Sequence, residues 1–121
     1  MKLDFDCLRN VLLAVEKLSG YGYAVDNTML NECPLTAKYS DEVLTYHVKQ
    51  LINANLFIDA DVYATGFAIT DLSFAGHNFV DKIRKDDNWH KVKDILKKAS
   101  SFSSPIVQAV ISGAIGHQLG F

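Results

Sequence analysis

The amino-acid sequence predicts a mainly helical fold with a small β-hairpin. Apolar residues recur every three or four positions along most of the chain, which is typical of amphipathic helices. Near the middle, two short apolar runs bounded by polar residues and glycine indicate two strands. With 121 residues, of which 49% are hydrophobic, the chain is long enough for one core, so we expect a single domain over residues 1–121.

A first helix is predicted near the N-terminus. Asp4 or Asp6 can cap it, because a short carboxylate accepts hydrogen bonds from the free N–H groups of a first turn. The pattern ends at Gly20, which suits the left-handed conformation that follows many helices. The apolar positions of this helix are Leu8, Val11, Leu12, Val15 and Leu18.

Over residues 21–39 the pattern is weak. Residues 23–25 are compatible with a short strand, and Pro34 disfavours a regular helix through the middle. We therefore expect a loop here, with one helical turn at most. Ser40 opens a second helix, whose inward stripe is formed by Val43, Leu44, Val48, Leu51 and Ile52.

The two predicted strands cover residues 56–58 and 67–69, and residues 59–66 form the turn between them. Ser73 then caps a third helix, because its hydroxyl can accept a hydrogen bond from the first turn. The inner face of this helix carries Gly76, Phe79, Val80 and Ile83.

Two further helices complete the chain. Residues 86–88 end the third helix and cap a fourth, and Pro105 suits the first position of a last helix that we expect to run to about Leu119. The stripe of the fourth helix is Trp89, Val92, Ile95, Leu96 and Ala99. Helix, loop, helix, strand, turn, strand, helix is the element order of a winged-helix domain. We therefore expect a winged-helix-like core over residues 1–87 and a C-terminal helical extension over residues 88–121.

Most of the chain resembles a known family. The likeness is carried by Tyr46-His47, by residues 48–51, by the run over residues 69–84 and by Trp89. It is similar to an uncharacterised family, a domain of unknown function found in bacteria and in their phages and prophages. The resemblance implies a winged-helix fold and a mobile-element context, and it implies no activity, substrate or catalytic residue.

Nothing in the residue pattern indicates an enzyme, a cofactor or a small-molecule substrate. The chain has neither a nucleophile turn nor a phosphate-binding loop, so we expect no catalytic residues. Four histidines, His47, His77, His90 and His117, lack the spacing of metal ligands. We expect His47 to be a hydrogen-bonded core residue and His77 to bond a neighbouring carbonyl.

The cysteines and the chain's hydropathy suggest a cellular location. Cys7 and Cys33 lie far apart and outside any paired spacing, which favours buried, reduced thiols over a disulfide or a reactive thiol. The N-terminus lacks the apolar run of a secretory signal. The most apolar stretch, residues 105–119, is shorter than the roughly 20 residues that span a bilayer. We expect a cytoplasmic protein without a membrane partner.

Charge is distributed unevenly along the chain. The formal net charge is −2, but residues 1–72 carry −5 and residues 73–121 carry +3. The helix predicted to begin at Ser40 has an outward face that we expect to bind a partner, formed by Tyr46, Lys49, Gln50 and Asn53. A DNA-reading helix and wing need basic side chains, whereas Asp41, Glu42, Asp59 and Asp61 fall in these elements. We therefore expect a non-enzymatic regulatory protein that binds a protein partner.

The alternative is a DNA-binding transcriptional regulator that uses the helix over residues 40–55 and the basic segment over residues 82–98. Its nucleic-acid contacts would come from Lys82, Arg84, Lys85, Lys91 and Lys98. The competing interpretation of this segment is a solvated outer face with charge pairs at helical spacing.

The last predicted helix is apolar on nearly all sides. Such a helix either passes through the centre of the fold or is covered by a second subunit or another partner. The residues expected in a homodimer interface are Val107, Val110, Ile111, Gly113 and Ala114.

Overall fold

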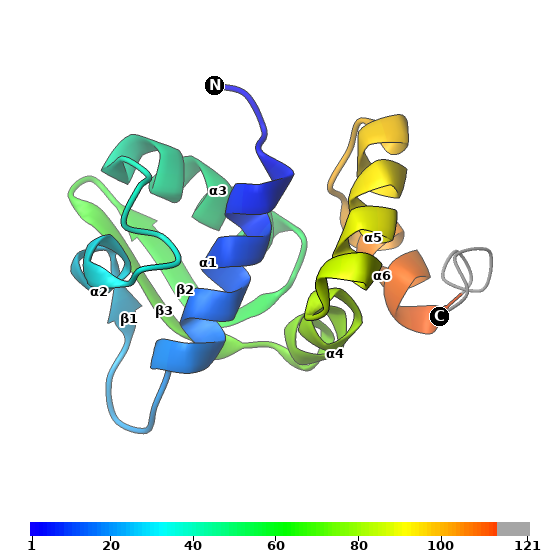
Figure 1. Cartoon of the computed structure of the whole chain (residues 1–121). Helices are drawn as coiled ribbons and strands as arrows, with labels where there is room; N and C mark the ends of the chain where they lie inside the picture. The colour runs from blue at the N-terminus through cyan, green and yellow to red at the C-terminus, as the bar shows by residue number, and fades with distance from the viewer. Residues whose placement is uncertain (114–121) are drawn as a thin grey trace.

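The computed structural model describes residues 1–113, which form helices around a small antiparallel sheet (Figure 1). The predicted mainly helical fold with a small β-hairpin is confirmed, and a further strand extends the hairpin to a three-stranded sheet. The elements are α1 (Phe5–Leu18), β1 (Val25–Asp26), α2 (Asn27–Glu32), α3 (Asp41–Asn53), β2 (Phe57–Tyr63), β3 (Gly66–Leu72), α4 (Phe74–Ile83), α5 (Asp86–Ala99) and α6 (Ser104–Ser112).

Three predicted helix starts are confirmed by their capping hydrogen bonds. The carboxylate of Asp4 accepts from the N–H of Cys7 at 3.2 Å, at the start of α1. The hydroxyls of Ser40 and Ser73 accept from the third residue of α3 and of α4, at 3.2 and 3.0 Å. The prediction that residues 86–88 cap α5 is wrong. That helix begins one residue after Lys85 and has no side-chain cap, and Asp86 and Asp87 lie inside its first turn.

The segment between α1 and α3 is more ordered than a loop. β1 pairs with β3, and the carboxylate of Asp26 caps α2 by accepting from the N–H of Met29 at 2.9 Å. The expected loop is therefore wrong for residues 25–32. Because α2 has six residues and buries only Leu30, it is too short to produce a helical pattern in the sequence. Pro34 follows the helix end, as its missing N–H requires.

The sheet has the strand order β1-β3-β2, and the β2–β3 hairpin turns at residues 64–65. The expected short strands and eight-residue turn are wrong, because β2 and β3 have seven residues each. The alternation of buried side chains breaks in both strands at one level. Asp59 has a φ of 48°, and the hydroxyl of Thr70 donates to its carbonyl oxygen at 3.0 Å. This kink turns Phe57 and Leu72 inward on one side of the break, and Ala60 and Ile69 on the other.

One apolar core joins all the helices. In Figure 1, α1 lies in the middle, with α2, α3 and the sheet on one side and α4 and α5 on the other. The buried residues of α1 and α3 continue into the inner faces predicted for α4 and α5, where Phe79, Trp89 and Leu96 are buried. Ile95 is only half-buried and Ala99 is exposed, so the predicted α5 stripe is wider than the buried face.

The last described helix ends early. α6 stops at Ser112, and Gly113 follows with a left-handed φ of 80°. The remainder of the helix predicted to reach Leu119 lies outside the described residues. Within residues 1–113, no helix is long and apolar enough to cross a membrane: α1 and α5 have 14 residues each, against about 20 for a span.

Candidate docking surface

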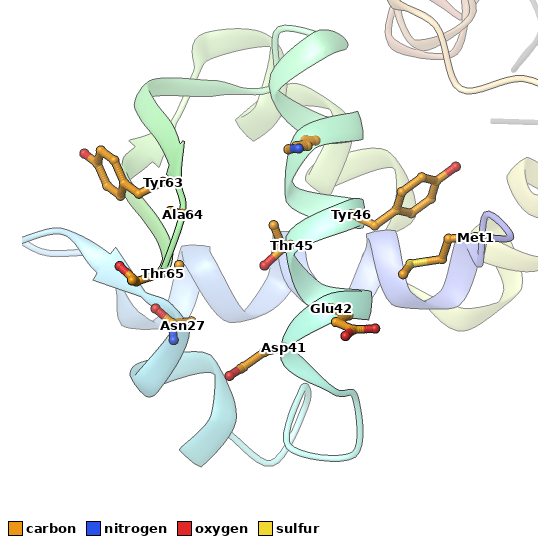
Figure 2. Close-up of a pocket in the computed structure, with 11 residues that line it drawn as sticks. Met1, Asn27, Asp41, Glu42, Thr45, Tyr46, Tyr63, Ala64 and Thr65 are labelled. Atoms are coloured by element: carbon orange, nitrogen blue, oxygen red, sulfur yellow. The ribbon is translucent and has the colours of Figure 1, made fainter.

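A shallow hollow of about 450 Å³ lies over the outer face of α3. Figure 2 shows α3 as its floor, with the hairpin turn on one side and Tyr46 beside Met1 on the other. A second hollow of about 280 Å³ shares Lys49 with the first and continues between the C-terminal half of α3 and strand β2. We call these two hollows together the α3–hairpin groove.

The packing of α3 decides which of its side chains line the groove. Leu44, His47, Val48 and Leu51 are buried against the core, which turns the opposite face outward. Of the four residues predicted to bind a partner, Lys49 and Asn53 are exposed, and Tyr46 and Gln50 are half-buried.

His47 fixes the inner side of this helix. Its side chain is 1% exposed, and Nδ1 lies 2.7 Å from the carbonyl oxygen of Val43, where it donates. Nε2 then accepts from the backbone N–H of Asp4 at 2.9 Å. The predicted hydrogen-bonded core histidine is confirmed. The ring of Tyr46 packs edge-on against it, with centroids 5.1 Å apart, so this tyrosine is held at the rim of the groove.

The groove is acidic. Asp41 and Glu42 line its beginning at the N-terminus of α3, and Asp61 lines the second hollow, whereas Lys49 is the single basic side chain among the lining residues. The acidic residues expected in the hairpin turn, Asp59 and Asp61, lie instead in strand β2. The turn itself, residues 64–65, is uncharged.

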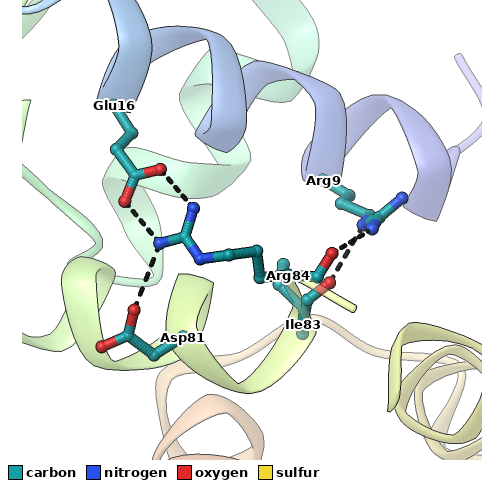
Figure 3. Close-up of polar contacts among 5 residues, drawn as sticks. All are labelled: Arg9, Glu16, Asp81, Ile83 and Arg84. Atoms are coloured by element: carbon teal, nitrogen blue, oxygen red, sulfur yellow. Dashed lines mark hydrogen bonds and ion pairs between the residues drawn. The ribbon is translucent and has the colours of Figure 1, made fainter. Parts of the chain in front are cut away.

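The predicted basic segment is partly neutralised by the chain itself. The guanidinium of Arg84 donates to both carboxylate oxygens of Glu16, at 2.7 and 2.8 Å, and to Asp81 at 3.2 Å (Figure 3). The Glu16 hydrogen bond is also the main reason why the pKa of Arg84 is raised. Lys93 donates to Asp6 in α1. Of the other expected nucleic-acid residues, Lys82 on α4 is half-buried, whereas Lys85 just before α5 and Lys91 and Lys98 on α5 are exposed.

Two α1 side chains that sequence reasoning missed join the helices. Arg9 donates through Nε to the carbonyl of Ile83 at 3.1 Å, and through a terminal nitrogen to Asp86 at 3.0 Å. Figure 3 shows it reaching the carbonyl oxygens at the end of α4. Asp6 accepts from the indole N–H of Trp89 at 2.9 Å. Both partners lie more than 70 residues away in the sequence, so no local pattern reveals these contacts.

The residues expected in a dimer interface do not form one surface. Val107 and Val110 are covered by this chain, with exposed fractions of 0% and 1%, and α6 packs against α4. Ile111 and Gly113 are half-buried, and Ala114 lies outside the described residues.

The reactive residue types lie away from the groove. Cys7 and Cys33 are free and buried, as predicted, and burial raises the pKa of the Cys7 thiol to about 12. His77 faces the carboxylate of Asp71 at 3.8 Å, so the expected bond to a carbonyl is wrong. Within residues 1–113, no three histidine, cysteine or carboxylate side chains gather as metal ligands would.

Comparison with known proteins places the chain in a family. The model of a family described as "Hypothetical protein (DUF2513)" matches residues 2–103. The chain belongs to the DUF2513 family. An uncharacterized protein of Haemophilus influenzae (strain ATCC 51907 / DSM 11121 / KW20 / Rd) is similar to it, with 30% identity over 105 residues, 83% of this chain and 82% of that protein. No solved structure matches. The DUF2513 match includes every lining residue of the α3–hairpin groove except Met1, and all of α5, whereas α6 begins just beyond it.

Proposed function

We propose that this chain is a non-enzymatic binding protein, built on a winged-helix scaffold, that docks a protein partner in the α3–hairpin groove. The scaffold assignment is supported by the element order from α1 to β3 and by the strand order β1-β3-β2, in which the first strand pairs with the third. On such a scaffold, the helix before the hairpin and the hairpin itself form the usual contact surface. These elements border the groove.

The charge of the groove carries the choice of a protein partner. Binding to duplex DNA draws much of its free energy from lysine and arginine side chains that neutralise phosphates. The groove offers Lys49 against Asp41, Glu42 and Asp61, so a phosphate backbone laid along it would meet net repulsion. A protein surface places no such requirement on the sign of the charge.

The winged-helix element order also favours a second candidate, a DNA-binding regulator that uses α3 and the basic residues over 82–98. Two observations weigh against it. Arg84 is held by Glu16, and Lys93 is held by Asp6, so part of the positive charge is committed within the chain. Moreover, none of the basic residues over 82–98 lines the α3–hairpin groove, and Lys93 and Lys97 line a separate hollow beside the N-terminal segment.

The family resemblance adds a setting to this proposal. A phage or prophage protein of this kind would act on a protein of the bacterial host, as a regulator or a modulator of a host factor. The groove would then be the surface that recognises this host protein.

Binding to random-sequence duplex DNA, followed by fluorescence anisotropy at increasing salt, separates the two candidates. We expect no binding at low salt. Micromolar affinity that falls steeply with salt, and that is weakened by Lys85→Glu with Lys98→Glu, would favour the DNA-binding regulator instead. Site-specific photo-cross-linking from Thr45, inside the groove, should capture a protein that the same cross-linker placed at Lys98 does not capture. Equal capture from both positions contradicts docking in the groove.

A further inference from the structure

The α3–hairpin groove combines two kinds of side chain that suit one class of occupant. At the N-terminal end of α3, Asp41 and Glu42 are exposed, and Asp61 adds a third carboxylate beyond Lys49. None of these three carboxylates takes part in an ion pair found among residues 1–113. Their charge is therefore directed at solvent.

Apolar side chains flank these carboxylates. Tyr63 on the hairpin is 58% exposed and Met1 on the opposite rim is 68% exposed, although both are large. Both line the first hollow (Figure 2), and Ile52 and Val62 line the second. Large apolar side chains thus remain exposed on both rims of the same hollow, where a docking partner could cover them.

We propose that the occupant of the groove is a cationic, amphipathic segment of a partner protein. Its arginine or lysine side chains would pair with Asp41, Glu42 and Asp61, and its apolar side chains would pack on Tyr63 and Met1. The inference rests on the proposed function in taking the groove as the docking surface, and it adds the chemistry of what docks there. Complementary charge would fix the direction of the segment, because Lys49 lies between the two carboxylates of the first hollow and the one carboxylate of the second, so the pattern of charge along the groove is asymmetric.

A second copy of this chain is the nearest competing occupant, since residues 73–121 carry a net +3. Arg84 and Lys93, however, form ion pairs with carboxylates of their own chain. Less positive charge is therefore left to attract the acidic groove of a second copy. Self-association is therefore an outcome that the test must recognise rather than the expected result.

The test is an NMR titration of the ¹⁵N-labelled full chain with a short synthetic peptide of alternating arginine and leucine blocks. An identical peptide with glutamate in place of arginine serves as the charge control. We expect the arginine peptide to shift the amide signals of Thr45, Lys49 and Thr65, and the glutamate peptide to shift none of them. Asp41→Asn with Glu42→Gln should weaken binding about tenfold.

Matched variants separate local charge from net charge. Asp87→Asn with Asp94→Asn removes the same charge from α5, including one first-turn carboxylate, and should change the affinity at most about twofold. Tyr63→Ser, on the exposed hairpin, tests the apolar half of the groove without altering a helix, and should weaken binding severalfold. Thermal melts of all variants show whether α3 remains folded.

Four results would overturn the inference. Binding of the glutamate peptide in the groove would reverse the charge of the occupant. Arginine-peptide shifts located elsewhere, or equal weakening by both charge-removing pairs, would make the attraction nonspecific. Concentration-dependent shifts at the same amides without any peptide would identify a second copy as the occupant. If Thr45 still cross-links to a protein in any of these cases, the docking function stands and only the cationic occupant is refuted.

Discussion

Arg84, which follows α4, donates two parallel hydrogen bonds of 2.7 and 2.8 Å to the carboxylate of Glu16 in α1. The same arginine donates to Asp81, in the last turn of α4, at 3.2 Å. Nearby, Arg9 of α1 donates to the carbonyl oxygens of Ile83 and Arg84, which have no partner further along α4. The end of α4 is therefore held to α1 by two arginines, one from each side of the interface.

Removing the bidentate pair should weaken the α1–α4 contact. We expect Arg84→Ala to lower the free energy of unfolding by about 0.5–1 kcal/mol, because both partners are partly exposed to water. Arg84→Lys should recover only part of this, since an ammonium cannot donate in parallel to two oxygens. Urea unfolding of Arg84→Ala, Glu16→Gln and the double variant measures the coupling. Strict additivity of the two single effects would show that the pair contributes nothing.

Acid should destabilise the fold through two α1 carboxylates. The hydrogen bond from Arg84 lowers the pKa of Glu16. For Asp6, burial raises the pKa. Hydrogen bonds from Lys93 and Trp89, together with nearby positive charge, lower it by more, so the net shift of the pKa is downward. Groups with a lowered pKa in the folded state stabilise it fully above their ordinary pKa, and this stabilisation is lost as the pH falls through the folded values.

The free energy of unfolding should therefore decline below about pH 4, where carboxylates of the unfolded chain take up protons. Asp6→Asn with Glu16→Gln should flatten that decline, whereas Asp94→Asn, at an exposed site in α5, should leave its slope unchanged. Denaturant unfolding at a series of pH values measures it. An equal slope in the double variant and the unmodified chain would contradict the role assigned to these carboxylates.

Replacing His47 should separate its hydrogen bonds from its volume. His47→Leu leaves the N–H of Asp4 without its acceptor, and we expect a loss of about 1–3 kcal/mol in stability. His47→Gln offers an oxygen near the position of Nε2 and should lose less. The same two substitutions at His90, which is exposed, provide the control and should change stability little. Equal losses for leucine and glutamine at position 47 would mean that packing alone matters there.

Gly76 lets α4 approach the backbone of Leu56, the residue just before β2. A Cβ at this position would overlap the carbonyl oxygen of Leu56, a backbone atom that cannot move aside alone. Gly76→Ala should therefore destabilise the fold by about 1–3 kcal/mol, although alanine favours a helix over glycine by about 1 kcal/mol. Asn78→Ala in the same helix should change little. A thermal melt in which Gly76→Ala raises the midpoint would refute the close contact.

Much of the helical framework follows from local chemistry, which a sequence displays directly. The caps Asp4, Ser40 and Ser73 each bond an N–H three residues ahead, so their position beside an apolar stripe is enough to locate a helix start. The inward stripe of α3 likewise predicted the buried positions Leu44, Val48 and Leu51, whereas Ile52, also expected inward, lines the second hollow. The outward face of α3, which forms the floor of the groove, could therefore be predicted from the sequence.

The hairpin could not be predicted in the same way, because the alternation of buried and exposed side chains along its strands depends on one backbone angle. Asp59 has a left-handed φ, and its carbonyl oxygen accepts a hydrogen bond from the Thr70 hydroxyl on the neighbouring strand. At this level the inward-facing side chains change from one set of alternate positions to the other. The sequence pattern of two seven-residue strands therefore looks like two short apolar runs. The opposite rim of the groove, formed by the β2–β3 turn, was misplaced for this reason.

The charges of the chain were also determined partly by the sequence and partly by the tertiary structure. The sequence by itself determined that the second part of the chain is basic and that the face of α3 begins with two acids. Only the tertiary structure decided which charges remain available, because the partners are far apart along the chain: Arg84 meets Glu16 across 68 residues and Lys93 meets Asp6 across 87. It also decided that Val107 and Val110 are covered by their own chain. Apolar periodicity shows that a face must be buried, but only the packing of distant helices determines what buries it.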